Sequence, residues 1–244
     1  MPIQTQILDT DDQVAQAAAN SIANFIRQKP NAVIGLATGA TPVKTYAELV
    51  RIHREENLSF AKVTTFNLDE YWGLEGDHDQ SYRYFMQTHL FDHIDIHPWN
   101  THVPNGKAID PNLEGEAYEA QIRAWGGIDL WLLGIGKNGH IAFNEPGSTR
   151  NSRTRQIDLL SDTIEANARF FKNKADVPQK ALTVGIATMF DARQILLLAT
   201  GAGKADAIKH ALHDQPGTHC PASFLQAHPN CTFVIDQAAA THIR

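Results

Sequence analysis

Cysteine and long apolar runs are scarce in this 244-residue sequence. Its two cysteines, Cys220 and Cys231, stand in no signature setting, and the first ten residues lack the basic and apolar regions of a secretory signal. We therefore expect two free thiols in a reducing cytoplasm rather than a disulfide. No apolar run approaches the roughly 18 residues of a bilayer-spanning helix, so we expect no contact with a membrane.

Positive charge is also in short supply. The 27 Asp and Glu residues outnumber the 21 Lys and Arg residues, which gives a net charge of −6 and a pI of about 6.0. Because a nucleic-acid binder needs a cationic face, this balance favours a small-molecule partner. Without any linker, repeat or low-complexity tract, residues 1–244 are expected to form one domain. Whether that domain forms a homo-oligomer is left open by the residues.

Several motifs of common mechanisms are missing. No GxSxG elbow is present, so a covalent acyl intermediate has no support. His89, His93 and His97 have helical spacing but no HExxH-like pattern, and we expect no metal there. The nucleotide-binding GxxxxGK[ST] pattern would need Gly at Leu198 and Ser or Thr at Ala205, which argues against a bound triphosphate.

One cofactor-binding motif is matched in sequence, but without the helix that such a site requires. Residues 134–139, GIGKNG, match the dinucleotide-binding GxGxxG pattern. Such a site also needs a helix directly after the glycines, because the helix N-terminus binds the pyrophosphate. Asn144, Pro146 and Gly147 end any such helix within two turns, so we expect no dinucleotide cofactor.

Short apolar runs alternate with amphipathic stretches along the chain. Strands are predicted at residues 32–37, 63–68, 128–135, 194–200 and 231–235. Helices are predicted after Asp11 and Thr41, and at residues 81–90, 113–125, 162–171, 182–190 and 205–212. Thr41 is expected to be an N-cap, with Pro42 at the first helical position. The alternation predicts an α/β fold with an open, mostly parallel sheet and helices on both faces, a three-layer Rossmann-like arrangement.

Ligands of such sheets lie beyond the carboxyl ends of the strands, where this chain has two loops suited to a phosphate. The first loop consists of Thr38, Gly39, Ala40 and Thr41. The second runs from Thr200 to Lys204, and its lysine would add a positive charge. Backbone N–H groups at a helix N-terminus bind anions, although either loop alone is equally well explained as an ordinary turn. The two together favour an anion site.

Candidate proton-transfer groups follow two other predicted strands. Asp69 and Glu70 are adjacent carboxylates, one of which burial could turn into a base; the alternative is a solvated turn. His140 and Glu145 lie close together on a loop, and a histidine oriented by a carboxylate commonly transfers protons near neutral pH. A carboxylate base, a histidine acid and one phosphate fit proton abstraction beside the carbonyl of a sugar phosphate.

Two segments also carry a resemblance. Residues 66–71, FNLDEY, and 134–147, GIGKNGHIAFNEPG, resemble those of the glucosamine-6-phosphate deaminase (isomerase) family, and the likeness extends from about the first strand to the last. It implies conversion of glucosamine 6-phosphate and water to fructose 6-phosphate and ammonia, in amino-sugar catabolism, with no metal or organic cofactor. It also implies catalytic roles for Asp69, Asn138, His140 and Glu145.

The resemblance implies a task for each residue. Asp69 would move a proton from C2 to C1 of the opened sugar, and His140, assisted by Glu145, would open the ring. The phosphate would be bound by Thr38 to Thr41, Arg169 and Lys204. Longer family members carry Asp where this chain has Asn138. An amide cannot share a proton with an imidazole, so we expect the orientation of His140 to depend mainly on Glu145.

Two alternative functions stay open at this point. The related 6-phosphogluconolactonases would release acid from a lactone and no ammonia. A sugar-phosphate sensing domain would keep the phosphate loops without the chemistry. Ser148 and Arg155 match the activator site of longer deaminases, but Ile157 stands where those have Lys, and the chain stops at Arg244 without their tail. We therefore do not expect activation by N-acetylglucosamine 6-phosphate.

Overall fold

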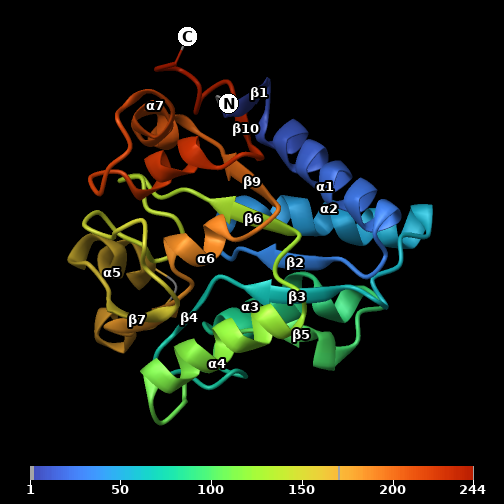
Figure 1. The fold of residues 1–244 in the computed structure, drawn as a ribbon, viewed down its shortest axis with the longest axis horizontal. Helices are drawn as coiled ribbons and strands as arrows, with labels where there is room; N and C mark the ends of the chain where they lie inside the picture. Colours follow the sequence, from blue (N-terminus) through green and yellow to red (C-terminus); the bar gives the residue numbers. More distant parts are fainter. Residues whose placement is uncertain (1–2, 170, 244) are drawn as a thin grey trace.

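The strands of this protein form two sheets (Figure 1). The computed structural model describes residues 3–169 and 171–243. The larger sheet has seven parallel strands in the order β1-β10-β9-β6-β2-β3-β5. The smaller is antiparallel, in the order β4-β8-β7. The open parallel sheet is confirmed, whereas nothing in the sequence pattern predicted the second sheet.

The elements have the following bounds. The larger sheet comprises β1 (Gln4–Leu8), β2 (Val33–Leu36), β3 (Thr64–Asn67), β5 (Thr101–His102), β6 (Leu130–Gly134), β9 (Gln194–Ala199) and β10 (Cys231–Asp236). The smaller comprises β4 (Asp69–Tyr71), β7 (Arg155–Asp158) and β8 (Lys180–Thr183). The α-helices are α1 (Asp11–Gln28), α2 (Ala40–Glu56), α3 (Tyr82–His89), α4 (Pro111–Ala124), α5 (Ser161–Ala168), α6 (Ile186–Phe190) and α7 (Ala205–His213). Short 3-10 helices are η1 (Phe91–His93), η2 (Pro98–Asn100), η3 (Lys174–Asp176), η4 (Ala202–Lys204) and η5 (Pro221–Ala227).

The central strands β2, β6 and β9 of the larger sheet are buried on both faces, which explains why they are mostly apolar, whereas the edge strand β1 is largely exposed. Along β6, Leu130 and Leu132 point to one core, which includes residues of α1, α2 and α3. Trp131 and Leu133 point to the other, which includes residues of α4, α6 and α7. Trp131 fits because its neighbour on β2 is Gly35, where a Cβ would lie 1.6 Å from the indole ring. The sheet with its two helical layers is the predicted three-layer arrangement.

The chain passes from the larger sheet to the smaller one through a single buried residue. Leu68 donates its N–H to Leu36 beside β2 at 3.1 Å, and its carbonyl accepts from Val184 beyond β8 at 2.7 Å. The predicted strand at residues 63–68 therefore ends at Asn67, and the next strand begins at Asp69 in another sheet. This switch places β4 next to the carboxyl ends of the parallel strands.

Two local predictions are wrong. Gly39, not Thr41, is the N-cap of α2, because a φ of 97° there suits glycine, and the helix already begins at Ala40. The predicted helix at 182–190 is instead the end of β8 followed by the short α6. A short apolar run cannot be assigned to helix or strand by periodicity alone, and pairing with β4 and β7 decides for the strand.

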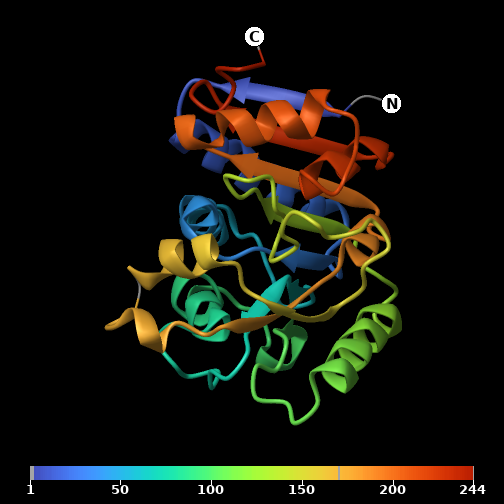
Figure 2. The ribbon, with the colours of Figure 1, turned by 90° about the vertical axis from the view of Figure 1, so that its left-hand side faces the viewer.

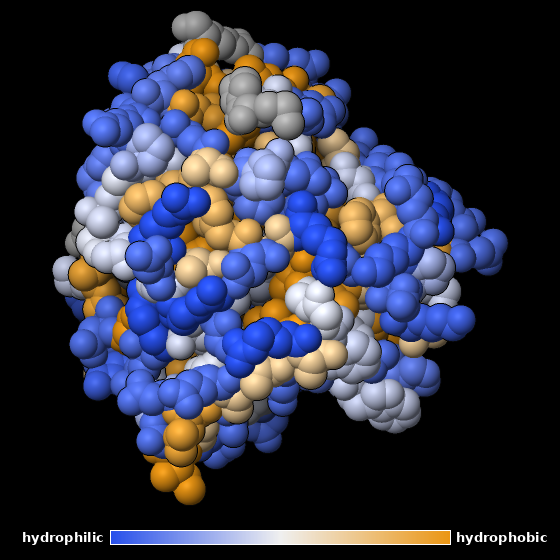
Figure 3. All heavy atoms as spheres, viewed as in Figure 1, coloured by the Kyte–Doolittle hydropathy of each residue, from blue (hydrophilic) through white to orange (hydrophobic). Residues whose placement is uncertain are grey.

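The surface and the cysteines complete the description. Cys220 and Cys231 are free and buried, as predicted. Among the described residues, no helix has the length and apolar character needed to cross a membrane. Polar and apolar atoms are mixed on the face shown in Figure 3, with an apolar tip at the lower left over the N-terminal end of α4, where Ile109 and Leu113 are exposed.

Candidate active site

The carboxyl ends of the parallel strands face the smaller sheet and α5, which cross in front of them in Figure 2. The strands β2, β3, β6 and β9 end at this edge. The segments that follow them contain the predicted residues Thr38 to Thr41, Asp69, Asn138, His140, Glu145 and Lys204. The fold therefore gathers these predicted groups, which are far apart in the sequence, at one edge of one sheet.

Glu145 is the centre of a hydrogen-bonded group on the loop after β6. Its Oε2 accepts from Asn138 Nδ2 at 2.8 Å and lies 3.1 Å from His140 Nδ1. Burial alone would raise the pKa of Glu145, but contacts with His140, Thr163 and Asn138 outweigh it, so that the pKa lies below that of an ordinary glutamate. An ionised Glu145 can therefore hold the ring by Nδ1 and leave Nε2 for proton transfer.

Asn138 contacts this group differently from a carboxylate. Its amide donates to Glu145, and its Oδ1 accepts from the backbone N–H of His140 at 3.2 Å. Both contacts orient neighbours of the imidazole, while the ring nitrogen Nδ1 faces Glu145. This arrangement agrees with the expectation that the histidine is oriented mainly by Glu145.

Glycines allow the backbone to pack closely around the His140 ring. Gly136 donates its N–H to the His140 carbonyl at 2.8 Å, and a Cβ at Gly136 would lie 2.2 Å from the ring. Gly139 has a φ of 82°, and a Cβ there would lie 2.4 Å from Cys220 Sγ. Two of the three glycines of the GxGxxG match, Gly136 and Gly139, thus make room for the histidine and the buried cysteine.

Asp69 and Glu70 lie at the start of β4 and are both buried, so they are not a solvated turn. Burial raises the pKa of Asp69 well above its usual value, and the charge of Glu70 raises it further. Glu70 accepts N–H groups of Tyr71, Tyr82 and Arg83 at 2.8, 2.9 and 3.0 Å. Burial nevertheless raises the pKa of Glu70 to about 7. Through these hydrogen bonds Glu70 connects α3 to β4, directly beside Asp69.

This pair predicts a pH dependence. In the base role that the resemblance implies, Asp69 accepts a proton only when ionised, so activity should fall as the pH drops through its raised pKa, at a higher pH than for an ordinary carboxylate. Glu70→Gln removes the neighbouring charge and should lower the pKa of Asp69. The acid limb of kcat/KM against pH should therefore move to lower pH.

The matched control for this change is Glu75→Gln. Glu75 is exposed and forms an ion pair with Lys107 at 3.6 Å. The same loss of charge at this position should leave the acid limb in place. An unmoved limb in Glu70→Gln would mean that Asp69 does not control it.

The two predicted phosphate loops differ in what they offer. In the first, Gly39 has a left-handed backbone, so the chain turns directly into α2, whose first N–H groups have no partner inside the helix. In the second, the N–H of Gly201 is donated to the carboxylate of Asp236 at 2.9 Å. The first loop is therefore the better source of backbone donors.

Two cations complete the predicted phosphate set. Lys204 Nζ donates to the Ile135 carbonyl at 2.6 Å, which places it at the end of β6. Burial lowers the pKa of Lys204, and the charge of Lys137 lowers it further. Arg169 is an exposed residue at the C-cap of α5. A phosphate bound beside Lys204 would therefore also lie near the positive charge of Lys137, a residue that was not predicted to bind it.

One residue that contacts the His140–Glu145 pair was not predicted from the sequence. Thr163 of α5 is buried, and its hydroxyl donates to Glu145 Oε1. No motif connects a threonine with a glutamate 18 residues away. Only the docking of α5 against the loop after β6 brings the two together.

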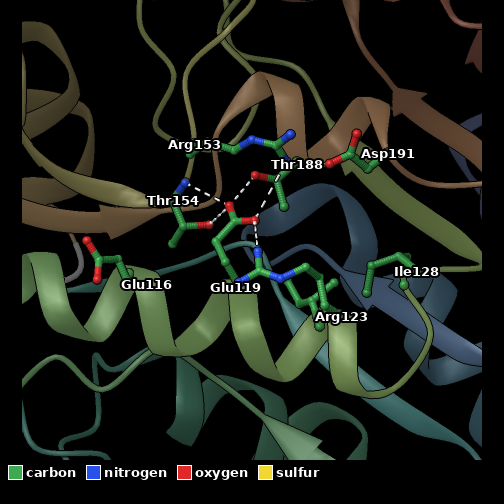
Figure 4. A pocket seen from close by; sticks show the side chains of 11 residues that line it. Glu116, Glu119, Arg123, Ile128, Arg153, Thr154, Thr188 and Asp191 are labelled. Carbon is green, nitrogen blue, oxygen red and sulfur yellow. Dashed lines mark hydrogen bonds and ion pairs between the residues drawn. The ribbon is translucent and has the colours of Figure 1, made fainter.

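A separate cavity of about 550 Å³ lies along α4, away from the predicted residues (Figure 4). There the buried Glu119 accepts from the backbone and hydroxyl of Thr154 at 3.0 and 2.8 Å, and from the Thr188 hydroxyl. Arg123 and Arg153 lie 3.8 and 3.7 Å from its other oxygen. These contacts join α4 to α6 and to the start of β7, and we assign Glu119 a structural role.

Comparison with known proteins identifies the family. Residues 9–234 match the family model of glucosamine-6-phosphate isomerases and 6-phosphogluconolactonase. The chain belongs to this family. Glucosamine-6-phosphate deaminase 1 of Giardia intestinalis is 57% identical over 222 residues, which are 91% of this chain and 84% of that protein.

Solved structures of the family separate its two branches. A monomeric glucosamine-6-phosphate deaminase matches with a TM-score of 0.96 and 44% identity, covering 98% of this chain and 100% of that one. The 6-phosphogluconolactonase of Trypanosoma brucei matches with a TM-score of 0.79 and 22% identity, covering 99% of each chain. The lactonase therefore shares the fold, while the deaminases are also close in sequence.

Proposed function

We propose that this protein is a glucosamine-6-phosphate deaminase, which converts glucosamine 6-phosphate and water to fructose 6-phosphate and ammonia. The observation that carries the proposal is 57% identity, over most of both chains, to a deaminase. The site geometry supports it, because a buried carboxylate and a histidine–carboxylate pair suit the required proton transfers. The reaction belongs to amino-sugar catabolism, and we place it in the cytoplasm.

Ring opening is the first step we assign. His140 Nε2 takes the proton of the C1 hydroxyl and delivers a proton to the ring oxygen as the C1–O5 bond breaks, which yields the open-chain aldehyde. Glu145 Oε2 faces Nδ1, so it stabilises the imidazolium that exists between the two transfers. Asn138 donates to the same oxygen, Oε2, and helps to keep Glu145 in this orientation.

Isomerisation and loss of ammonia follow. Asp69 takes the C2 proton, which the neighbouring aldehyde makes acidic, and returns it to C1. The aldehyde oxygen O1 gains a proton and the C2 amine loses one, so that C1 carries a hydroxyl and C2 an imine; water then adds to C2, and the C2–N bond breaks to leave the ketone and ammonia. The raised pKa of Asp69 makes it a stronger base than an ordinary carboxylate once it is ionised. No step needs a metal or organic cofactor.

The phosphate is assigned to Thr38, Gly39, Ala40 and Thr41 with Arg169 and Lys204. Lys204→Ala should raise KM for glucosamine 6-phosphate about tenfold or more, with kcat within a few-fold, because a charged hydrogen bond to an unreactive group is lost. Lys209→Ala removes the same charge from an exposed position of α7 and should change neither constant. An unchanged KM in Lys204→Ala would remove this lysine from the phosphate site.

One assay tests the proposed function. Purified protein is incubated with glucosamine 6-phosphate, and ammonia and fructose 6-phosphate are measured together. We expect both products in equal amounts. Lactone hydrolysis of 6-phosphogluconolactone without ammonia release from the amino sugar would overturn the proposal in favour of the other branch of the family.

A further inference from the structure

We propose that Thr163 is a positioning residue for the reaction proposed above: its hydroxyl holds Glu145 so that the other carboxylate oxygen faces His140. Thr163 Oγ1 donates to Glu145 Oε1, while Oε2 serves the histidine and Asn138. The two oxygens are therefore held from opposite sides. A carboxylate fixed at one oxygen cannot rotate without breaking that bond, so the orientation of Oε2 depends on Thr163.

The burial of Thr163 shows that this contact is part of the packed interior. Only 8% of Thr163 and 6% of Glu145 are exposed, although Ser161 and Glu165 on the same helix are exposed. A hydroxyl buried beside an ionised carboxylate is strongly favoured as its donor, because little water competes. α5 thus points its buried hydroxyl at the loop after β6.

An apolar cluster holds α5 in the place that this contact requires. Ile164, next to Thr163, packs on a cluster that includes Tyr71, directly after the Asp69–Glu70 pair, and Phe143, between His140 and Glu145. The rings of Tyr71 and Phe143 are 5.8 Å apart. Docking of α5 therefore touches both halves of the candidate site. Because Thr163 lies on α5, the orientation of the His140–Glu145 pair depends on this docking of α5.

Thr163→Val tests the proposal, since valine keeps the shape and removes the hydroxyl. We expect kcat for glucosamine 6-phosphate to fall about tenfold, with KM within about twofold, because Thr163 touches Glu145 and not the substrate. Thr163→Ser retains a hydroxyl and should restore most of kcat. The reduced, open-chain substrate analogue 2-amino-2-deoxyglucitol 6-phosphate should bind both variants as it binds the unchanged protein.

A matched control comes from the cavity along α4. Thr188 donates to the buried Glu119 through an equivalent hydroxyl–carboxylate contact, in a cavity that no residue of the candidate site lines. Thr188→Val should lower thermal stability to a similar extent and leave kcat and its pH profile unchanged. Equal losses of kcat in Thr163→Val and Thr188→Val would reduce Thr163 to a structural role and overturn the proposal.

Two further measurements separate positioning from packing. In a Glu145→Gln background, Thr163→Val should lower kcat by less than about twofold, because its partner carboxylate is already gone. A full tenfold loss in that background would contradict the proposal. By carbon-13 NMR without substrate, the pKa of Glu145 should rise in Thr163→Val, which loses a donor that favours the ionised form, and stay unchanged in Thr188→Val.

The NMR measurement also keeps the two proposals distinguishable. If the unchanged protein released no ammonia, the proposed function would fail, yet a raised pKa of Glu145 in Thr163→Val would still show the positioning contact. An unmoved pKa of Glu145 in an active enzyme would overturn the role of Thr163 and leave the deaminase function intact.

Discussion

Replacing Asp69 with Asn should lower kcat for ammonia release about a thousandfold, the loss typical of a missing general base. The amide has nearly the shape of the carboxyl group and cannot take the C2 proton. Binding of glucosamine 6-phosphate, measured by calorimetry, should persist because the phosphate and ring contacts are unaltered. Ammonia release within tenfold of that of the unchanged protein would show that another group is the base.

Stability measurements separate this loss from misfolding. Because burial raises the pKa of Asp69 above that of the unfolded chain, this carboxyl group opposes folding at neutral pH, and the cost disappears when the pH falls below the pKa of Asp69 in the unfolded chain. A neutral Asn avoids the cost, so the melting temperature at neutral pH should not fall. Asp158→Asn, at an exposed position on β7 whose ion pair with Lys180 spans 3.7 Å, serves as the control and should stay fully active.

His140→Gln should lower kcat by about a hundredfold or more, because the glutamine amide can donate to Glu145 as the imidazole does but cannot shuttle a proton. The kinetics should also change in form. Sugar phosphates open slowly without help, so the variant can use only the open-chain aldehyde that forms in solution. Its velocity should therefore level off as the enzyme concentration rises, whereas Asp69→Asn should stay inactive at any concentration.

The control for this prediction is His213→Gln at the exposed C-terminal end of α7. It should keep both the rate and a linear dependence on enzyme concentration. If the velocity of His140→Gln stayed proportional to enzyme concentration, even where ring opening in solution should limit it, a different group would open the ring.

Strands β2, β3, β6, β9 and β10 of the parallel sheet were predictable because they are almost wholly buried, whereas the exposed β1 and the two-residue β5 were not predicted. Buried strands are mostly apolar, and the alternation of residues such as Leu130 and Trp131 between two cores leaves no polar face to obscure the pattern. The smaller sheet has no such signal. Its strand β7 is half-buried and mostly polar, and β4 begins with two carboxylates, so neither has the composition of an ordinary strand.

Of the candidate site, the sequence by itself determined which residues are chemically suited and that they follow strand ends. Asp69, His140 and Glu145 were found in this way, because the carboxyl ends of parallel strands necessarily meet at one edge. Local chain geometry also decided that His140 and Glu145 would be neighbours, since only four residues separate them.

Only the tertiary structure decided the environments and the remote contacts. Whether Asp69 and Glu70 are solvated or buried depends on β8 and α3, which pack on β4 from distant parts of the chain. The contact of Thr163 with Glu145 likewise exists only because α5 docks on the loop after β6. Burial and hydrogen bonding set the pKa values, and both are properties of segments brought together in space, so the identity of a residue alone cannot specify them.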